Sequence, residues 1–215
     1  MKLIKPSFKI IEQQPGLEGL YKQIEMAGRT CYKSEDKITD ESANKFVAGL
    51  IKRNHEAMLE HSFLSVRFIC DRGVSHELVR HRLASFAQES TRYCNYTQNR
   101  FGSKELTFIK PLFWDKDSFE YSRWEIACKN AEDEYFRLMS QPGCTPQEAR
   151  SVLPNSIKTE VVMSTNYREW RHFFKLRAAR ATGPAHPQME EITRPLLEEL
   201  KTLIPVVFDD IIIAE

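Results

Sequence analysis

The spacing of hydrophobic residues changes along the chain, and each spacing predicts a different element. After Pro15, apolar residues recur every three or four positions from Leu17 to Ile24 and more clearly from Ala43 to Ile51, as in amphipathic helices. Between Ser62 and Cys70 every second residue is apolar, as in a half-buried strand. The first third of the chain is therefore expected to form two helices and then a strand.

A turn and a short helix are expected after this strand. Asp71, Arg72 and Gly73 have the composition of a turn. Ser75 is the expected N-cap of a helix that runs into Arg80. The arginine-rich segment that follows should thus begin on a helix and then leave it.

The middle of the chain predicts one long helix and one short helix. The long helix spans about Phe119 to Met139 and ends at Gln141-Pro142-Gly143. Its inward-facing residues are expected to be Trp124, Ala127, Ala131, Tyr135 and Leu138. Thr145-Pro146-Gln147-Glu148 matches a capping box with proline at the first helical position, so a short helix should present Arg150 before Pro154 ends it.

The last part of the chain predicts a second strand and two helices. Residues 157–163 alternate as a strand, and Asn166 or Thr165 can cap the helix that follows. A final helix begins after Pro187 and is expected to bend at Pro195. Its inward-facing residues are expected to be Met189, Ile192, Leu196, Leu200 and Leu203.

Length and charge limit the classes of protein that fit. No repeat or linker divides the 215 residues, so 1–215 are expected to form a single α+β domain, mostly helical with a small sheet. The 31 basic and 30 acidic side chains give none of the global positive field typical of nucleic-acid-binding proteins. Charged residues interrupt every apolar stretch before it reaches membrane-spanning length, and no leader is evident. We therefore expect a soluble, cytoplasmic protein.

The cysteines indicate reduced thiols. They form an odd set without a CxxC pair, which favours neither a disulfide framework nor a zinc knuckle. The five residues are Cys31, Cys70, Cys94, Cys128 and Cys144. Each is interpreted as a small buried hydrophobe, with Cys94 of most interest because it follows Arg92 by two positions.

The segment from Arg80 to Arg92 concentrates side chains that recognise anions. Arg80, Arg82 and Arg92 can each donate two parallel hydrogen bonds to a phosphate, and His81 and Ser90 add further polar groups. The segment could equally be a solvated helix end followed by a polar loop, and composition does not decide between the two.

The order of motifs along the chain favours the anion-binding interpretation over the solvated helix end. Arg80-His81-Arg82, seven residues and then Ser90 resemble the signature of the flavin-dependent thymidylate synthases. Further features of this family occur in the same order, namely GRTCY at 28–32, EHSF at 60–63, RSVLP at 150–154, Asn166, His172, LR at 176–177 and AHPQ at 185–188. The resemblance spans most of residues 28–192.

This resemblance implies a reaction and an assembly. The family converts dUMP to dTMP with a methylene group from 5,10-methylenetetrahydrofolate and electrons from NADPH that pass through bound FAD. The mechanism requires no covalent enzyme nucleophile, so Ser90 is expected to be a hydrogen-bond donor only. The resemblance also implies a homotetramer with active sites shared between subunits. The balanced charge and the interrupted apolar stretches predict neither a nucleic-acid partner nor a membrane.

The resemblance also assigns residues. Arg177 matches the arginine that faces the uracil ring and is the expected catalytic residue, where a fixed cation can stabilise negative charge on the pyrimidine. The residues expected to bind dUMP are Glu77, Arg80, Gln88, Ser90, Arg92, Arg150 and Arg177. Those expected to contact FAD are His61, Arg80, His81, Arg82, Gln88, Asn166, Arg168, His172 and His186. No metal is expected. The Ala178–Ala185 link is longer than in shorter family members.

Three other hypotheses fit parts of the sequence. His76-Glu77 opens a string like that of zinc hydrolases, but Arg80 stands where the second histidine should be. A non-enzymatic single-stranded nucleic-acid-binding module is the main alternative, because aromatic residues accompany the arginine cluster. A flavin-free synthase would need a nucleophilic cysteine, for which only Cys94 lies near the motif.

Overall fold

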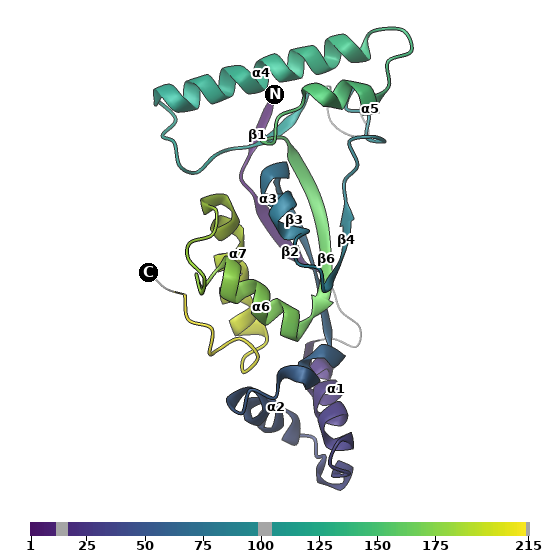
Figure 1. Cartoon of the computed structure of the whole chain (residues 1–215), viewed down its shortest axis with the longest axis vertical. Coiled ribbons are helices and arrows are strands. Elements are labelled where there is room, and N and C mark those ends of the chain that lie inside the picture. Colours follow the sequence, from purple (N-terminus) through teal and green to yellow (C-terminus); the bar gives the residue numbers. More distant parts are fainter. Residues whose placement is uncertain (12–16, 99–104, 214–215) are drawn as a thin grey trace. The chain divides into compact units, whose positions relative to one another are not determined.

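The computed structural model describes residues 1–11, 17–98 and 105–213 (Figure 1). Pro15, expected just before the first helix, lies outside these residues. The chain divides into two compact units. The first unit comprises Met1–Ser7, Phe68–Arg80 and Ala87–Val161, and the second comprises Phe8–Arg67, His81–Phe86 and Val162–Glu215. Elements of both types are present, in agreement with the α+β class, and the single domain stays a prediction.

A four-stranded sheet has the order β2-β3-β6-β4, and each of its strands contributes residues to both units. The strands are β2 (Ser7–Ile10), β3 (Phe63–Asp71), β6 (Lys158–Asn166) and β4 (Ala84–Gln88). The alternation predicted for β3 and β6 is confirmed, since Leu64, Val66 and Phe68 are buried. The edge strand β4 was not predicted, because none of its five side chains is fully buried.

The start of α3 (Arg72–Leu78) differs from the prediction. The N-cap is Asp71, whose Oδ1 accepts a hydrogen bond from the Val74 amide at 2.6 Å. Ser75 is buried inside the helix instead, and its hydroxyl donates to the Arg72 carbonyl at 2.9 Å. The helix ends at Leu78, so Arg80 lies beyond it.

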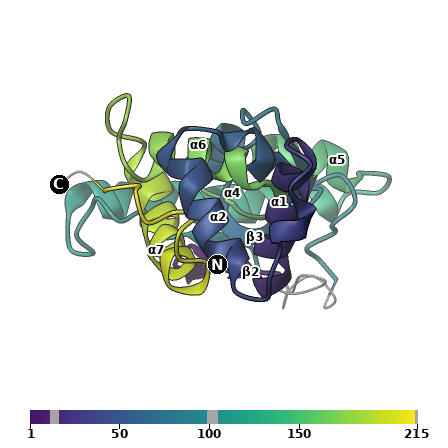
Figure 2. The same ribbon diagram turned by 90° about the horizontal axis from the view of Figure 1, so that it is seen from below.

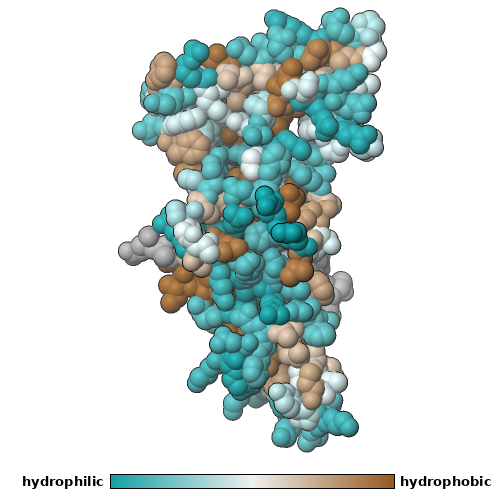
Figure 3. Space-filling view, in the orientation of Figure 1, coloured by the Kyte–Doolittle hydropathy of each residue, from teal (hydrophilic) through white to brown (hydrophobic). Residues whose placement is uncertain are grey.

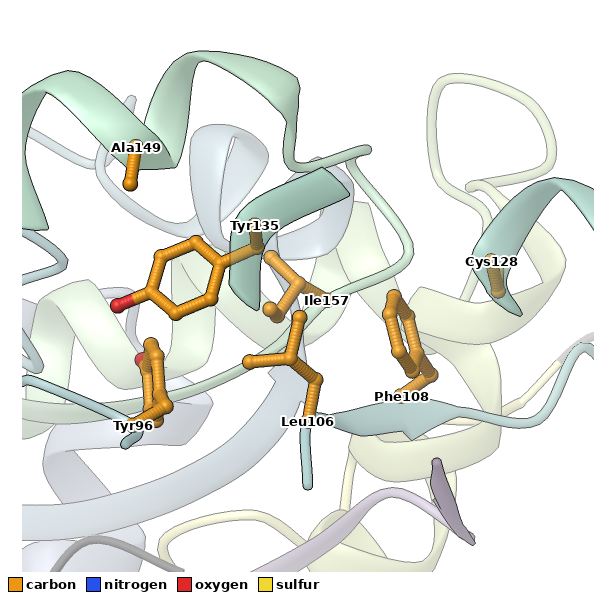
Figure 4. Close-up of a cluster of buried hydrophobic side chains, with 7 residues drawn as sticks. All are labelled: Tyr96, Leu106, Phe108, Cys128, Tyr135, Ala149 and Ile157. Atoms are coloured by element: carbon orange, nitrogen blue, oxygen red, sulfur yellow. The ribbon is translucent and has the colours of Figure 1, made fainter. Parts of the chain in front are cut away.

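In the first unit, a hydrophobic cluster includes two residues of the long helix α4 (Phe119–Met139), and Figure 4 shows its side chains. The members of the cluster are Tyr96, Leu106, Phe108, Cys128, Tyr135, Ala149 and Ile157. Phe108 lies on β5 (Thr107–Ile109), which pairs in parallel with β1 (Lys2–Ile4). The cluster therefore joins α4 to this two-stranded sheet.

The bounds of α4 are as predicted, but its buried face is not. Tyr135 is buried as expected, whereas Ala127 is exposed, and the buried face also includes Glu132. The Glu132 carboxylate accepts a hydrogen bond from the Leu106 amide at 2.6 Å and pairs with the Met1 ammonium at 2.9 Å. These partners stabilise a buried charge that hydrophobic periodicity assigns to solvent.

The short helix α5 (Pro146–Ala149) begins with the predicted capping box. The Glu148 carboxylate accepts hydrogen bonds from both the backbone amide and the hydroxyl of Thr145, at 2.8 and 2.6 Å. The 3-10 helix η3 (Arg150–Val152) follows directly. Arg150 is exposed there, as the sequence predicted.

The second unit is built mainly of helices. Helices α1 and α2 lie side by side, as do α6 and α7 (Figures 1 and 2). The elements are α1 (Leu17–Thr30), η1 (Glu35–Lys37), α2 (Ser42–Lys52), η2 (Glu56–His61), α6 (Tyr167–Arg177) and α7 (Pro187–Leu203). Leu203, predicted to face inward, is 44% exposed, because it lies in the last turn of α7. The bend at Pro195 stays a prediction.

None of the helices in the described ranges is long and apolar enough to cross a membrane.

Arg171 on α6 is a buried cation that anchors the C-terminal segment of the second unit. Its guanidinium donates to both carboxylate oxygens of Asp210, at 2.6 and 2.7 Å, and to the Val207 carbonyl. Its Nε donates to Glu56 Oε1 at 3.0 Å. The hydrogen bond from Arg171 holds the pKa of Asp210 below its usual value. This pair should therefore contribute stability that depends on pH.

We predict that Asp210→Asn lowers the free energy of unfolding by about 1–2 kcal/mol at pH 7, since it removes the charge opposite a buried guanidinium. The loss is modest because Asp210 is half-exposed and water screens the pair. Because the folded-state pKa of Asp210 is lowered, the stabilisation is complete above the unfolded pKa of about 4 and is lost as pH falls through the folded value. Urea unfolding from pH 7 to pH 3 measures this.

The exposed Asp133→Asn on α4 serves as the matched control and should change stability by less than about 0.5 kcal/mol. A difference between wild type and Asp210→Asn that stays constant down to pH 3 would contradict the pairing of Asp210 with Arg171.

Candidate functional site

A cavity of about 570 Å³ opens beside α6 in the second unit. It is lined by Glu56, Glu60, Leu83, Asn166, Arg168, Glu169, His172 and Lys175. The lining combines carboxylates, cations and amide or imidazole groups with one apolar side chain. Arg168 pairs with Glu60, and Lys175 lies 3.9 Å from Glu56, so both cations have acidic neighbours on the wall.

The junction between β6 and α6 determines which side chains line this cavity. The Asn166 side chain caps α6 by accepting a hydrogen bond from the Glu169 amide at 2.9 Å. The Tyr167 amide donates to the Ser62 carbonyl at 3.1 Å, which ties the first residue of the helix to the chain before β3. Positions 168, 172 and 175 then repeat at helical spacing and present one polar face. The cap predicted at Asn166 is confirmed.

Three polar residues of this unit form a hydrogen-bonded chain. His81 Nδ1 lies 3.0 Å from Glu169 Oε1, and Arg177 Nε donates to His81 Nε2 at 3.2 Å. His81 and Glu169 are both buried. Because Nε2 accepts from Arg177, the proton of the neutral imidazole must be on Nδ1, where it is donated to Glu169.

The surroundings of His81 favour this neutral form. Burial lowers the pKa of His81, and the nearby charges of Arg177 and His172 lower it further, against the opposing effect of the Glu169 carboxylate. The ring also packs edge-on against Phe173 at 4.9 Å. His81 is thus a fixed, uncharged bridge between a carboxylate and a guanidinium.

A second cavity, of about 420 Å³, lies in the first unit and differs in charge. It is lined by Arg72, Thr91, Gln147, Arg150, Ser151, Leu153, Pro154 and Asn155. Two of these side chains are guanidinium groups, four more carry hydroxyl or amide donors, and none of the eight is a carboxylate. Arg150 Nη1 donates to Thr91 Oγ1 at 3.3 Å, and within the described chain the buried Arg72 Nη1 has no hydrogen-bond partner. This composition suits an anion.

The segment that leads to Ser90 is held by buried and half-buried contacts in the first unit. Glu89 pairs with Lys158 at 2.9 Å and accepts from the Tyr96 hydroxyl at 2.9 Å. The Gln88 amide donates to the hydroxyls of Ser75 and Thr159, at 2.9 and 3.2 Å. These bonds fix the backbone on either side of the turn at Ser90.

The predicted site residues fall into three groups, which belong to the cavity of the second unit, to the cavity of the first unit or to neither. Asn166, Arg168 and His172 line the cavity of the second unit, and His81 and Arg177 are joined to its lining residue Glu169. Arg150 lines the cavity of the first unit. Besides His81 and Arg177, the predicted residues that line neither cavity are His61, Glu77, Arg80, Arg82, Gln88, Ser90, Arg92 and His186. His186 instead caps α7, where Nδ1 accepts from the Gln188 amide at 3.3 Å.

Sequence reasoning missed several residues of both cavities. Glu169 stands three positions before His172 on α6, a spacing that places both on one face, but a lone acidic residue carried no signal. Thr91 lies between the predicted Ser90 and Arg92 and could have been included on that ground. Arg72 was interpreted as part of a turn.

Two alternative hypotheses can now be compared with the geometry. Helix α3 carries His76 and ends at Leu78, so His81 does not share a helical face with it as a zinc hydrolase motif requires. Cys94 is half-buried, and burial followed by the nearby Glu89 charge raises the pKa of its thiol. A raised pKa leaves less thiolate at neutral pH and weighs against a covalent role.

Comparison with known proteins identifies the family. A family model described as "Thymidylate synthase complementing protein" matches residues 13–206. The flavin-dependent thymidylate synthase of Corynebacterium aurimucosum is 33% identical over 198 residues, covering 87% of this chain and 78% of the relative. That of Pyrococcus furiosus is 30% identical over 174 residues, covering 80% and 68%. The chain belongs to the family of flavin-dependent thymidylate synthases, as its motifs predicted.

A solved structure confirms the fold. The UMP/dUMP methylase PolB from Streptomyces cacaoi, bound with 5-Br dUMP, matches with a TM-score of 0.76 at 22% identity, over 97% of this chain and 96% of that chain. At this identity the likeness shows the architecture, which is the α+β arrangement described above.

We predict that Cys94→Ser retains thymidylate-forming activity within about threefold of wild type, because a thiol with a raised pKa is a weak nucleophile. A radiochemical or chromatographic assay of dTMP measures this. Cys31→Ser serves as the control, because Cys31 is exposed and the prediction that it is buried was wrong. Complete loss of activity in a folded Cys94→Ser protein would favour the covalent, flavin-free route.

Proposed function

We propose that this protein is an FAD-dependent thymidylate synthase that converts dUMP to dTMP by reductive methylation. The one-carbon unit comes from the methylene group of 5,10-methylenetetrahydrofolate, NADPH is the reductant, and no enzyme nucleophile attaches to the uracil. The observation that carries the proposal is Arg80-His81-Arg82, seven residues and then Ser90, in a chain that belongs to this family.

The cavity of the second unit fits a flavin dinucleotide. Asn166, Arg168, His172 and Lys175 line it with N–H donors, and Leu83 adds an apolar contact. Arg168 and Lys175 are cations of the kind that bind phosphate, and Glu60 and Glu56 lie beside them. The residues proposed to hold FAD are Asn166, Arg168 and His172 together with His61, Arg80, His81, Arg82, Gln88 and His186. When bound, FAD supplies the hydride chemistry.

Arg177 is the residue proposed to act on the uracil. A guanidinium keeps its positive charge throughout the reaction and can stabilise negative charge that develops on the pyrimidine as C5 becomes nucleophilic. The neutral His81 holds Arg177 by Nε, so this hydrogen bond does not engage the paired Nη1 and Nη2 groups. A fixed guanidinium needs little reorganisation during the reaction, which is the source of its catalytic advantage.

The cavity of the first unit is proposed to bind the phosphate of dUMP. Arg150 and Arg72 provide two guanidinium groups, Thr91 adds a hydroxyl, and the eight lining residues include no carboxylate that would repel a dianion. Further contacts to dUMP are proposed for Glu77, Arg80, Gln88, Ser90, Arg92 and Arg177. Charge-assisted bonds to the phosphate would discriminate dUMP from the uncharged nucleoside.

A homotetramer with shared active sites, acting in the cytoplasm, completes the proposal. Hydrophilic residues cover most of the face shown in Figure 3, with hydrophobic patches between them. Large exposed hydrophobic side chains include Tyr32, Leu83, Tyr93 and Phe119, each at least 73% exposed. Contacts between subunits would bury such side chains, which supports assembly.

We predict that the purified protein binds FAD and that anaerobic NADPH bleaches the flavin absorption bands. Addition of dUMP should perturb the spectrum, because the nucleotide is proposed to lie against the flavin ring. Visible absorption spectroscopy on the FAD-loaded protein, with and without dUMP, measures both effects. If the protein binds no flavin even with FAD added, the synthase proposal fails, and salt-sensitive oligonucleotide binding becomes the next test.

We predict that Arg150→Gln and Arg72→Gln each raise the Kd for dUMP about 10- to 100-fold, since each removes a charge-assisted bond of about 1.5–3 kcal/mol. Binding of deoxyuridine, which has no phosphate, should change little. Isothermal titration calorimetry measures both, with the exposed Arg123→Gln on α4 as the control. If the Kd for dUMP rises in Arg150→Gln but stays at the wild-type value in Arg72→Gln, Arg72 lies outside the phosphate site.

A further inference from the structure

Glu169 is a buried carboxylate that lines the second-unit cavity, and neither the motifs nor the family comparison gives it a role. Only 7% of the residue is exposed. Its carboxylate bonds to His81, which lies 88 positions away in the sequence, and its backbone amide donates to the Asn166 cap. A buried charge is costly unless its partners stabilise it, so this placement requires an explanation.

A metal site is the first explanation to consider. His81, Glu169 and His172 each offer one ligand atom, and these atoms lie within 4.8 Å of one another. Two histidines and one carboxylate can bind a divalent transition metal. However, a metal on His81 Nδ1 would displace the proton shared with Glu169, and the neutral ring would then carry its proton on Nε2, facing the N–H of Arg177. A metal on Nε2 would displace Arg177 directly.

The observed hydrogen bonds therefore favour a different role. We propose that Glu169 is a positioning residue, which fixes the His81 tautomer and through it the orientation of the Arg177 guanidinium. Glu169 accepts the Nδ1 proton, so Nε2 is left as the acceptor for Arg177 Nε. This inference deepens the proposed function, since it concerns the arginine proposed to face the uracil.

The local structure makes Glu169 suited to this role. It lies in the first turn of α6, where the helix dipole favours a negative charge. Its neighbours hold it from both sides, because its amide is tied to Asn166 and its carboxylate to His81. Arg177 lies in the last turn of the same helix, so one rigid element carries both ends of the hydrogen-bonded chain.

Substitution of Glu169 should therefore affect turnover more than nucleotide binding. In Glu169→Ala the imidazole loses its acceptor, so the proton can move to Nε2, and the hydrogen bond from Arg177 Nε to His81 is then lost. We expect kcat to fall about 10- to 100-fold, the range found for partners that orient active groups, with KM for dUMP changed less than about threefold. Glu169→Gln keeps a carbonyl acceptor and should retain kcat within about fivefold of wild type.

The experiment combines kinetics with a direct view of the tautomer. Steady-state assays of FAD-loaded wild type, Glu169→Ala, Glu169→Gln and the exposed control Glu198→Ala on α7 give kcat and KM. Long-range proton–nitrogen NMR spectra of protein with labelled histidine, at pH 7, show which nitrogen of His81 carries the proton. We expect Nδ1 in wild type and Glu169→Gln, and a population on Nε2 in Glu169→Ala.

Three results would overturn the positioning role. One is a wild-type His81 proton on Nε2, and another is a folded Glu169→Ala protein with wild-type kcat. The third is stoichiometric binding of added Co²⁺ to wild type, with visible absorption bands that Glu169→Ala lacks.

If Glu169→Ala does not fold, Glu169→Gln provides the test. A fall in kcat of more than tenfold in Glu169→Gln, with the His81 proton still on Nδ1, would count against the positioning role. A wild-type enzyme that makes no dTMP would refute the proposed function, whereas the NMR result would still test the tautomer.

Discussion

The second unit depends on how strand β6 passes into helix α6 at Asn166. No loop separates the two elements, and one amide side chain both ends the strand and caps the helix. This junction fixes the rotation of α6 about its axis, since a helix that began one residue later would turn its polar face by about 100°. The positions of Arg168, Glu169, His172 and Arg177 all follow from it. The cap at Asn166 and the hydrogen bond from the Tyr167 amide to the Ser62 carbonyl thus hold the α6 side of the candidate cofactor cavity in place.

The two cavities differ more in the charge of their lining residues than in volume. In the second unit, the two cations Arg168 and Lys175 each have a carboxylate beside them, and Glu169 adds a third carboxylate to the wall. In the first unit, the lining residues include two guanidinium groups and no carboxylate, a composition that suits an anion. The near-neutral net charge of the whole chain conceals this difference, because it sums over both units.

How much the sequence could predict depends on the range of the interactions. Helix α4, the capping box at Thr145 and the strands β3 and β6 follow from spacing and from contacts between near neighbours, and they were predicted correctly. The edge strand β4 has no fully buried residue and gives no periodic signal. Glu132 was not predicted to be buried, because its partners, Met1 and Leu106, are distant in the sequence. Local pattern carries no information about such pairs.

The same reasoning applies to the site. The motif residues could be assigned because their order along the chain resembles a family, whereas Arg72 and Glu169 belong to no motif of this chain. Their roles arise from neighbours that only folding brings together, such as His81 for Glu169, 88 positions away. A residue that belongs to no motif can still be assigned a candidate role once its burial and its hydrogen-bond partners are known.

The bridge formed by His81 also bears on how this enzyme can change over evolutionary time. Residues that share one hydrogen-bonded chain do not respond to substitution independently, because each change alters what its neighbours must satisfy. Positions 81, 169 and 177 should therefore behave as one epistatic group. An apolar residue at position 169 becomes acceptable only where another group takes over the Nδ1 proton.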